Sequence, residues 1–314
     1  MARSLKNTAA SVHQFLLNEA KKTSRPFNEL LQHYAIERFI YRLSKSSHSD
    51  RFILKGALMF SVWCGPASRP TMDVDLLGRI DNSLDVVISI IKDIVGLDVE
   101  ADGMSFNSET VTAVRILEDA EYKGVRVRVQ GNLGNARVSL QIDIGFGDVI
   151  VPGPDKVVYP VLLGFPPPEL YGYSMESTIA EKFQAMAKRG SLNSRMKDFY
   201  DIWMLSHTFN FQGELLAEAI KKTFENRNTP ISINQAVFDP EFINDRDKKV
   251  QWKGFISKSK IKNAPESFDD VFADIRVFLG PLVNSLVEGR VFKGVWNTPG
   301  PWRLFKGNRG GRPN

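Results

Sequence analysis

The sequence has a single cysteine, Cys64, and only four histidines among its 314 residues. One cysteine cannot form an intrachain disulfide, and it cannot supply the several thiolates of a zinc finger or an iron–sulfur cluster. The histidines lie far apart without zinc-ligand spacing, and no Gly-Lys-Ser/Thr segment of a P-loop is present. These absences exclude disulfide-stapled domains, multi-cysteine metal sites and P-loop nucleotide binding.

Long apolar runs are also missing, because no uninterrupted stretch approaches the ~18–20 residues of a membrane span. The basic start, residues 1–6, is followed by polar, helix-like sequence and not by the apolar core of a secretion signal. A single cysteine also suits a reducing compartment. We therefore expect a cytoplasmic protein without membrane attachment.

The positive charge of the chain is unevenly distributed. The formal net charge of the whole chain is +5, and acidic residues are absent from its last stretch, Arg290 to Asn314. Trp296, Trp302 and Phe305 lie beside these basic residues, and such a segment is typical of RNA-binding Arg-Gly tails that stack on bases. A solvated tail without a partner is the alternative. The basic residues of this stretch are Arg290, Lys293, Arg303, Lys306, Arg309 and Arg312.

The rest of the composition is that of a globular protein, with 43 % hydrophobic and 11 % aromatic residues, long enough for two domains. Periodicity predicts an α+β domain over 1–168, a mostly helical domain over 169–290 and a basic Gly/Arg tail over 291–314. Helices are expected at 9–22, 26–43, 83–95, 175–189, 195–207, 213–225 and 267–288. Strands are expected at 71–77, 109–117, 124–130 and 137–146, a strand–turn–helix at 51–63, and a connector at 152–168.

The segment from Thr71 to Leu77 alternates strictly between polar and apolar residues. Side chains two apart on a strand point to the same face, so Asp73 and Asp75 share a face with their Cα atoms ~6.6 Å apart. Two neighbouring carboxylates repel each other, and a divalent cation removes that cost. The pair therefore indicates a Mg²⁺ site that is completed by substrate phosphates.

A third carboxylate, Asp143, lies on another alternating strand at 137–146. If this strand pairs beside the first, the three carboxylates can hold two Mg²⁺ ions for phosphoryl or nucleotidyl transfer. The alternative is that Asp-x-Asp belongs to an ordinary exposed strand.

Upstream, Lys55-Gly56-Ala57 opens a predicted helix, and free backbone N–H groups at such a turn favour phosphate binding. The order of Gly turn, helix, Asp-x-Asp strand and later single-Asp strand resembles that of the polymerase-beta-like nucleotidyltransferases. Their usual signature is Gly-Gly or Gly-Ser, whereas this chain has Gly56-Ala57.

In the helical half, Lys182 falls on a mostly apolar helix stripe, and Asp198 and Asp201 are neighbours on the next helix. A lysine in such a stripe either extends its ammonium group to water or meets an anion in a cleft. The alternative is a structural ion-pair network that joins Lys182, Arg195 and Lys197 to the two aspartates.

Taken together, four segments of the chain strongly resemble the AbiEii-type nucleotidyltransferase toxins of bacterial abortive-infection toxin–antitoxin systems. The resemblance covers residues 30–210. The segments are Lys55-Gly56-Ala57, Arg69-Pro-Thr-Met-Asp-Val-Asp-Leu76, Ile179-Ala-Glu-Lys182 and Asn193-Ser-Arg-Met-Lys-Asp-Phe-Tyr-Asp201.

This resemblance implies an α+β protein with a polymerase-beta-like nucleotidyltransferase core and a mostly helical C-terminal domain. It also implies the site residues. Asp73 and Asp75 match the metal-binding pair, Lys182 an essential lysine, and Asp198 the acid of the last motif; Asp143 fits the third metal ligand. The residues expected to bind the nucleotide are Lys55, Gly56, Ala57, Arg69, Arg195, Lys197 and Asp201.

The resemblance further implies transfer of nucleotides from an NTP to RNA, above all to the tRNA 3′ end, which blocks translation. It implies Mg²⁺ as cofactor and a DNA-binding antitoxin as partner. Two alternatives remain open. One is a protein-directed nucleotidyl- or phosphotransferase, a GTP-binding toxin that uses the same Mg²⁺ cluster; the other is a non-catalytic binding protein on a decayed transferase fold.

Overall fold

The computed structural model describes residues 2–65, 71–118, 121–235, 238–259, 261 and 264–304. The chain forms two compact units. Unit 1 contains Met1–Asp148 and Pro154–Tyr173, and unit 2 contains Val149–Gly153 and Ser174–Asn314. Among the described residues, no helix is both long enough and apolar enough to cross a membrane.

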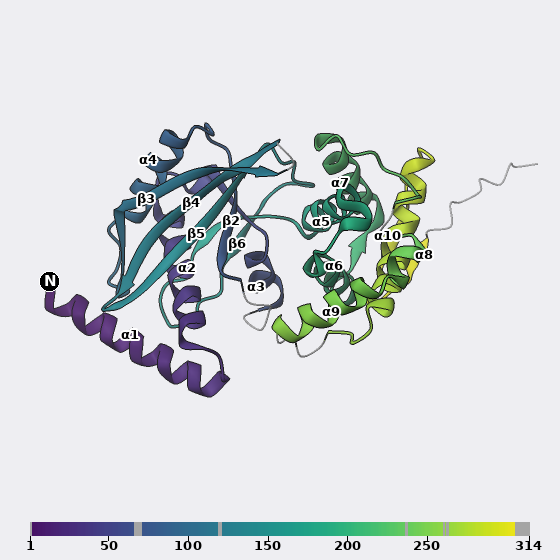
Figure 1. The fold of residues 1–314 in the computed structure, drawn as a ribbon. Coiled ribbons are helices and arrows are strands. Elements are labelled where there is room, and N and C mark those ends of the chain that lie inside the picture. The colour runs from purple at the N-terminus through teal and green to yellow at the C-terminus, as the bar shows by residue number, and fades with distance from the viewer. Residues whose placement is uncertain are drawn as a thin grey trace, which may run out of the picture. The chain divides into compact units, whose positions relative to one another are not determined.

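Unit 1 is built on a mixed seven-stranded sheet with the strand order β3-β4-β5-β2-β1-β7-β6 (Figure 1). β2 pairs in parallel with β5, and β1 pairs in parallel with β7, whereas the other neighbours are antiparallel. The strands are β1 (Phe52–Lys55), β2 (Asp73–Gly78), β3 (Met104–Glu118), β4 (Glu121–Leu133), β5 (Ala136–Phe146), β6 (Asp155–Val158) and β7 (Glu169–Gly172).

The helices of unit 1 bury the apolar face of this sheet. α2 contacts β5 and β7, and α4 contacts β3 and β4. Val138, Leu140, Ile142 and Ile144 alternate along β5 as buried residues, which is the pattern of a strand with one covered face. The helices are α1 (Ala2–Thr23), α2 (Phe27–Lys45), α3 (Leu58–Cys64) and α4 (Leu84–Val95), with a 3₁₀ turn at Ser49–Arg51.

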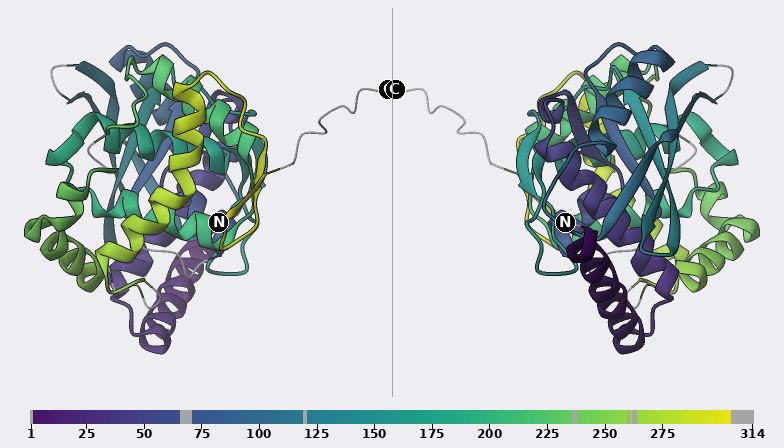
Figure 2. Two further views of the ribbon diagram at one scale, coloured as in Figure 1. Left: turned by 90° about the vertical axis from the view of Figure 1, so that its right-hand side faces the viewer. Right: turned by 90° about the vertical axis from the view of Figure 1, so that its left-hand side faces the viewer.

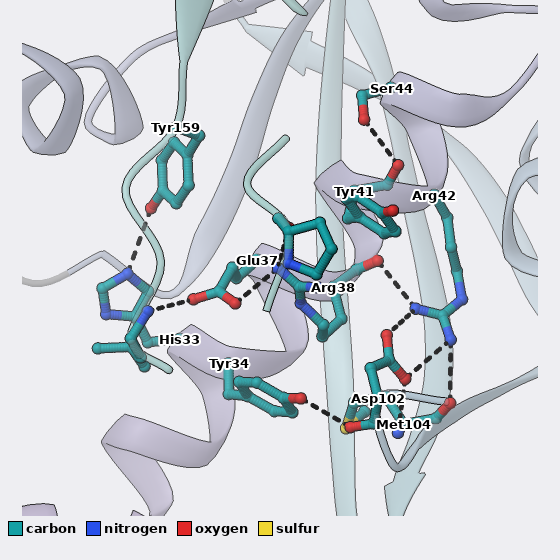
Figure 3. A network of polar contacts seen from close by, with 12 residues as sticks. His33, Tyr34, Glu37, Arg38, Tyr41, Arg42, Ser44, Asp102, Met104 and Tyr159 are labelled. Atoms are coloured by element: carbon teal, nitrogen blue, oxygen red, sulfur yellow. Dashed lines mark hydrogen bonds and ion pairs between the residues drawn. The ribbon is translucent and has the colours of Figure 1, made fainter. Parts of the chain in front are cut away.

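Helix α2 is buried on almost every side, and a polar network engages its buried charged residues (Figure 3). Arg42 donates two hydrogen bonds to the Asp102 carboxylate at 2.8 and 3.2 Å. Glu37 forms an ion pair with Arg38 and accepts a hydrogen bond from the Leu162 amide at 2.7 Å. Burial raises the pKa of Glu37 to about 7, against the opposing charge of Arg38.

Unit 2 is a helical bundle in which α5 packs on α7, and α6 packs on α10. α10 is the long yellow-green helix of Figure 2. The α5 helix begins at the N-cap Ser174, whose side chain accepts from the Ser177 amide, as its sequence indicates. The helices are α5 (Met175–Arg189), α6 (Met196–Thr208), α7 (Gly213–Asn226), α8 (Pro240–Asn244), α9 (Arg246–Ser259) and α10 (Phe268–Val287), with a 3₁₀ turn at Gly190–Leu192.

A three-stranded sheet completes unit 2 and corrects the expected role of Trp296. Its strands are β8 (Phe211–Gln212), β9 (Gly294–Trp296) and β10 (Trp302–Leu304). Trp296 is 2 % exposed, and its indole donates to the Ser206 carbonyl at 2.7 Å. The Trp302 ring stacks on Phe278 and donates to the Phe278 carbonyl at 2.7 Å. Trp296 is therefore part of the protein core, and the prediction that it stacks on bases is wrong, whereas Trp302 is half-buried and its stacking on bases stays a prediction.

The predicted helices and strands all exist, with ends shifted by a few residues. α1 is longer at its start than predicted. The connector expected at 152–168 contains β6, which pairs with β7. The prolines around β6 are the reason that the sequence indicated a connector and not a strand. Helices α8 and α9 were not predicted. Phe305 and the tail residues Lys306, Arg309 and Arg312 lie outside the described residues.

Candidate active site

The two aspartates of the alternating strand lie on one face of β2. Val74 and Leu76, between and beside them, are fully buried, whereas Asp73 and Asp75 are half-buried. The apolar residues anchor the strand in the core, so the carboxylates are directed to the opposite face of the sheet. The predicted orientation of the pair is confirmed.

Strand β5 brings a third carboxylate beside this pair. In the parallel register, Asp75 is the partner of Asp143, and Asp73 is the partner of Gln141. The pairing expected for the two strands is therefore confirmed. Whether Asp143 binds a metal is a separate question, because its carboxylate already has a cationic partner.

That partner is Arg126 of β4, which the sequence reading missed. Arg126 is the register partner of Asp143, and its Nε and Nη2 donate to the two carboxylate oxygens at 2.8 and 2.7 Å. Such a fork-to-fork pair is among the strongest ion-pair geometries in proteins. In the sequence, Arg126 and Arg128 alternate with buried valines along β4, which indicates that both arginines share the other face of the strand. Only the strand pairing shows which acidic residue Arg126 contacts.

The Lys55-Gly56-Ala57 segment lies next to the same carboxylates. Lys55 is opposite Asp75 across the β1–β2 pair, and its ammonium group forms an ion pair with Asp148 at 2.7 Å. Gly56 has φ of +68°, and a Cβ atom there would overlap the Asp75 carboxylate. Only glycine accommodates both the backbone conformation and this close approach. Ala57 precedes α3, which is just seven residues long.

The carboxylate oxygens of this site fit a hard divalent cation such as Mg²⁺. Among the described residues, no group of three or more His, Cys, Asp or Glu side chains is placed to hold a metal ion. Asp73 and Asp75 nevertheless offer hard oxygen ligands on one face, and Mg²⁺ is commonly held by one or two carboxylates together with substrate phosphates. The residues thus fit a cation that shares its ligands with a nucleotide. A metal-binding role for Asp143 stays a prediction.

A second polar cluster, in unit 2, joins α5 to α6. The Lys182 ammonium lies 3.1 Å from Asp198 and 2.6 Å from Asp201. Both carboxylates are buried, with exposed side-chain fractions of 1 % and 0 %. Arg195, the N-cap of α6, reaches Asp198 at 2.8 Å. The ion-pair network considered as an alternative therefore exists, and Lys182, Arg195, Asp198 and Asp201 belong to it.

The turn before α6 is held by one residue that the sequence analysis missed. Lys248 of α9 is buried, and its ammonium donates to the Asn193 carbonyl at 2.9 Å. The Asn193 side chain accepts from the Arg195 amide at 3.0 Å. Because Lys248 lies more than fifty residues from this turn, no local pattern could indicate the contact. Lys197 is exposed on α6, and Arg69 lies outside the described residues.

The comparison with family models shows the family of this chain. The sequence model of the nucleotidyl transferase AbiEii toxin family, a type IV toxin–antitoxin system, matches residues 38–274, which is more than half of the chain. No curated protein matches the chain significantly.

Two solved structures are similar to the fold. MenT4, a nucleotidyltransferase toxin from Mycobacterium tuberculosis H37Rv, has a TM-score of 0.51 and 15 % identity, and the match covers 88 % of this chain and 99 % of that chain. JHP933 from Helicobacter pylori has a TM-score of 0.46 and 14 % identity, covering 82 % and 94 %. The similarity to MenT4 shows a shared fold.

Proposed function

The chain belongs to the AbiEii nucleotidyl transferase toxin family, and from this premise we propose that it transfers nucleotides from an NTP to RNA, first of all to the tRNA 3′ end. The observation that carries the proposal is the pair Asp73 and Asp75 on one face of β2, with Gly56 leaving room for the Asp75 carboxylate. A divalent cation bound there would neutralise phosphate charge and orient the α-phosphate for in-line displacement.

The chain's own residues have separate parts in this proposal. Asp73 and Asp75 hold the cation together with the triphosphate oxygens. Lys55 and the turn at Gly56 and Ala57 lie beside Asp75, where they contribute positive charge and backbone N–H groups to phosphate binding. Lys182 is proposed to stabilise phosphate charge, a role that has to coexist with its ion pairs to Asp198 and Asp201.

From the same family membership, we expect an antitoxin partner that neutralises the effect of this activity. Translation would stop because a tRNA with an extended 3′ end cannot be aminoacylated. The basic stretch from Arg290 to Asn314, which is free of acidic residues, adds positive charge for holding RNA phosphates.

The test is to incubate the protein with Mg²⁺, total cellular RNA, total cellular protein and each NTP in turn, labelled either at the α- or at the γ-phosphate. We expect α-label in the tRNA fraction. Asp73→Asn and Asp75→Asn should each abolish the transfer while circular dichroism stays unchanged. Asp85→Asn, which alters an exposed aspartate on α4, is the matched control and should stay active.

Each other outcome has a clear meaning. α-Label in protein would support protein nucleotidylation, and γ-label in protein would support a phosphotransferase. A complete lack of labelling would support a binding protein on a decayed transferase fold. Full activity of Asp73→Asn or Asp75→Asn would mean that β2 does not carry the active site.

A further inference from the structure

Arg126 is the only described cation that the structure pairs with the Asp143 carboxylate, and it does so through both oxygens. The pair is partly accessible, with exposed side-chain fractions of 36 % for Arg126 and 20 % for Asp143. Gln141 adds a longer contact to Asp143 at 3.5 Å. Asp143 is thus engaged by its neighbours on the same face of the sheet before any cation reaches it.

The charge of Arg126 also acts on the other two carboxylates. The pKa of its guanidinium is raised, first by the hydrogen bonds to Asp143 and then by the negative charges of Asp143, Asp73 and Asp75. The attraction between the guanidinium group and the three carboxylates is mutual. Arg126 therefore offsets part of the negative charge that would attract a divalent cation. Both the positive charge of Arg126 and its hydrogen bonds to Asp143 therefore oppose the binding of a divalent cation at Asp143.

We propose that Arg126 is a positioning residue that withholds Asp143 from the divalent cation, so that the cation binds together with the nucleotide and not before it. The proposal rests on the function proposed above, because it concerns the same cation. To use Asp143 as a ligand, the cation would have to share both carboxylate oxygens with charge-assisted hydrogen bonds and lie close to a guanidinium group. Asp73 and Asp75 alone need phosphate oxygens to complete the coordination.

The experiment measures binding of Mn²⁺, used as the probe in place of Mg²⁺, to the full chain by titration calorimetry without nucleotide. In Arg126→Gln, the guanidinium charge is gone and Asp143 is released, so we expect Mn²⁺ to bind about tenfold more tightly than to the wild type, or better. Arg128→Gln is the matched control. Arg128 is exposed two residues further along β4, and its register partner on β5 is Gln141, not Asp143.

The double variant Arg126→Gln/Asp143→Asn tests whether the effect passes through Asp143. We expect its Mn²⁺ affinity to return to the wild-type level, because the released ligand is removed again. Unchanged or weaker Mn²⁺ binding in Arg126→Gln would overturn the proposal. A tenfold gain that persists in the double variant, or that also occurs in Arg128→Gln, would overturn it as well. Thermal unfolding of each variant in the same buffer checks that the fold is retained.

One further variant separates this proposal from the proposed function. Mn²⁺ binding, measured with and without a non-hydrolysable NTP analogue, should be lost in Asp73→Asn. If Asp73→Asn binds Mn²⁺ as the wild type does in the presence of the analogue, the cation site itself is wrong, and the proposed function fails with it. If binding depends on Asp73 but not on Arg126, only the role of Arg126 fails.

Discussion

Lys182 lies at the centre of the buried cluster that joins α5 to α6, and its replacement separates a structural from a catalytic contribution. Lys182→Met keeps the length and apolar stem of the side chain but removes the ammonium group. Asp201 is fully buried and loses its 2.6 Å partner, while Asp198 keeps the ion pair to Arg195. The variant therefore removes a positive charge that the wild type places beside two buried carboxylates.

The magnitude follows from this burial. Removal of one partner of a buried ion pair typically costs about 3–5 kcal/mol, because the remaining charge stays desolvated. We expect Lys182→Met to lose about that much of the free energy of unfolding of unit 2. In the double variant Lys182→Met/Asp201→Asn both charges are gone, so it should be about 2 kcal/mol more stable than Lys182→Met, and its loss should be smaller than the sum of the two single losses.

The stability assay is urea unfolding followed by far-UV circular dichroism. Label transfer from an α-labelled NTP is measured separately, without urea and at a temperature where all variants are folded. The double variant restores stability without restoring the ammonium group. If Lys182 also stabilises phosphate charge, transfer stays lost in the double variant although its stability recovers. Lys188→Met, an exposed lysine on the same helix, is the control.

Two results would refute this reasoning. An unchanged urea midpoint for Lys182→Met would show that the ion pairs contribute nothing to the stability of unit 2. Strict additivity of the two single variants would show that Lys182 and Asp201 do not interact. Recovery of transfer in the double variant would instead limit Lys182 to a structural role.

Three other perturbations test the remaining parts of the structure. Gly56→Ala should abolish transfer, because its Cβ atom would displace Asp75. Gly65→Ala, also at positive φ but with no described atom within 4 Å of the added Cβ, should lose about 1–3 kcal/mol of stability and stay active; equal activity of the two variants would contradict this. The pKa of Glu37 is raised by burial to about 7, so the wild type loses stability as the pH rises from 4.5 through 7. Glu37→Gln should match the wild type below pH 4.5 in chemical denaturation and exceed it by about 3 kcal/mol above pH 7; a constant difference across this range would refute the assignment. Truncation after Leu304 removes Lys306, Arg309 and Arg312 but keeps Trp302, which stacks on Phe278, and it should lower the salt slope of RNA binding by about 2–3 units without changing NTP affinity; an unchanged slope would mean that this segment does not contribute to RNA binding.

The sequence by itself was sufficient for features that depend on local periodicity. The alternation from Thr71 to Leu77 determines that Asp73 and Asp75 share a face, because successive side chains of a strand must point to opposite sides. The N-cap Ser174 and the apolar stripe after it determined where α5 begins. The charged motifs around Lys182 and Asp198 also carried the family resemblance, which the match over residues 38–274 confirms.

Only the tertiary structure decided which distant residues meet. The pairing of β4 with β5 places Arg126 on Asp143, and the packing of α9 places Lys248 on Asn193. It also placed Trp296 in the core, although its basic surroundings predicted an RNA-binding surface. Local pattern specifies which face a side chain takes, but strand order and helix packing depend on the free energy of the whole core. The partners of the site residues therefore could not be derived from the segments that contain them.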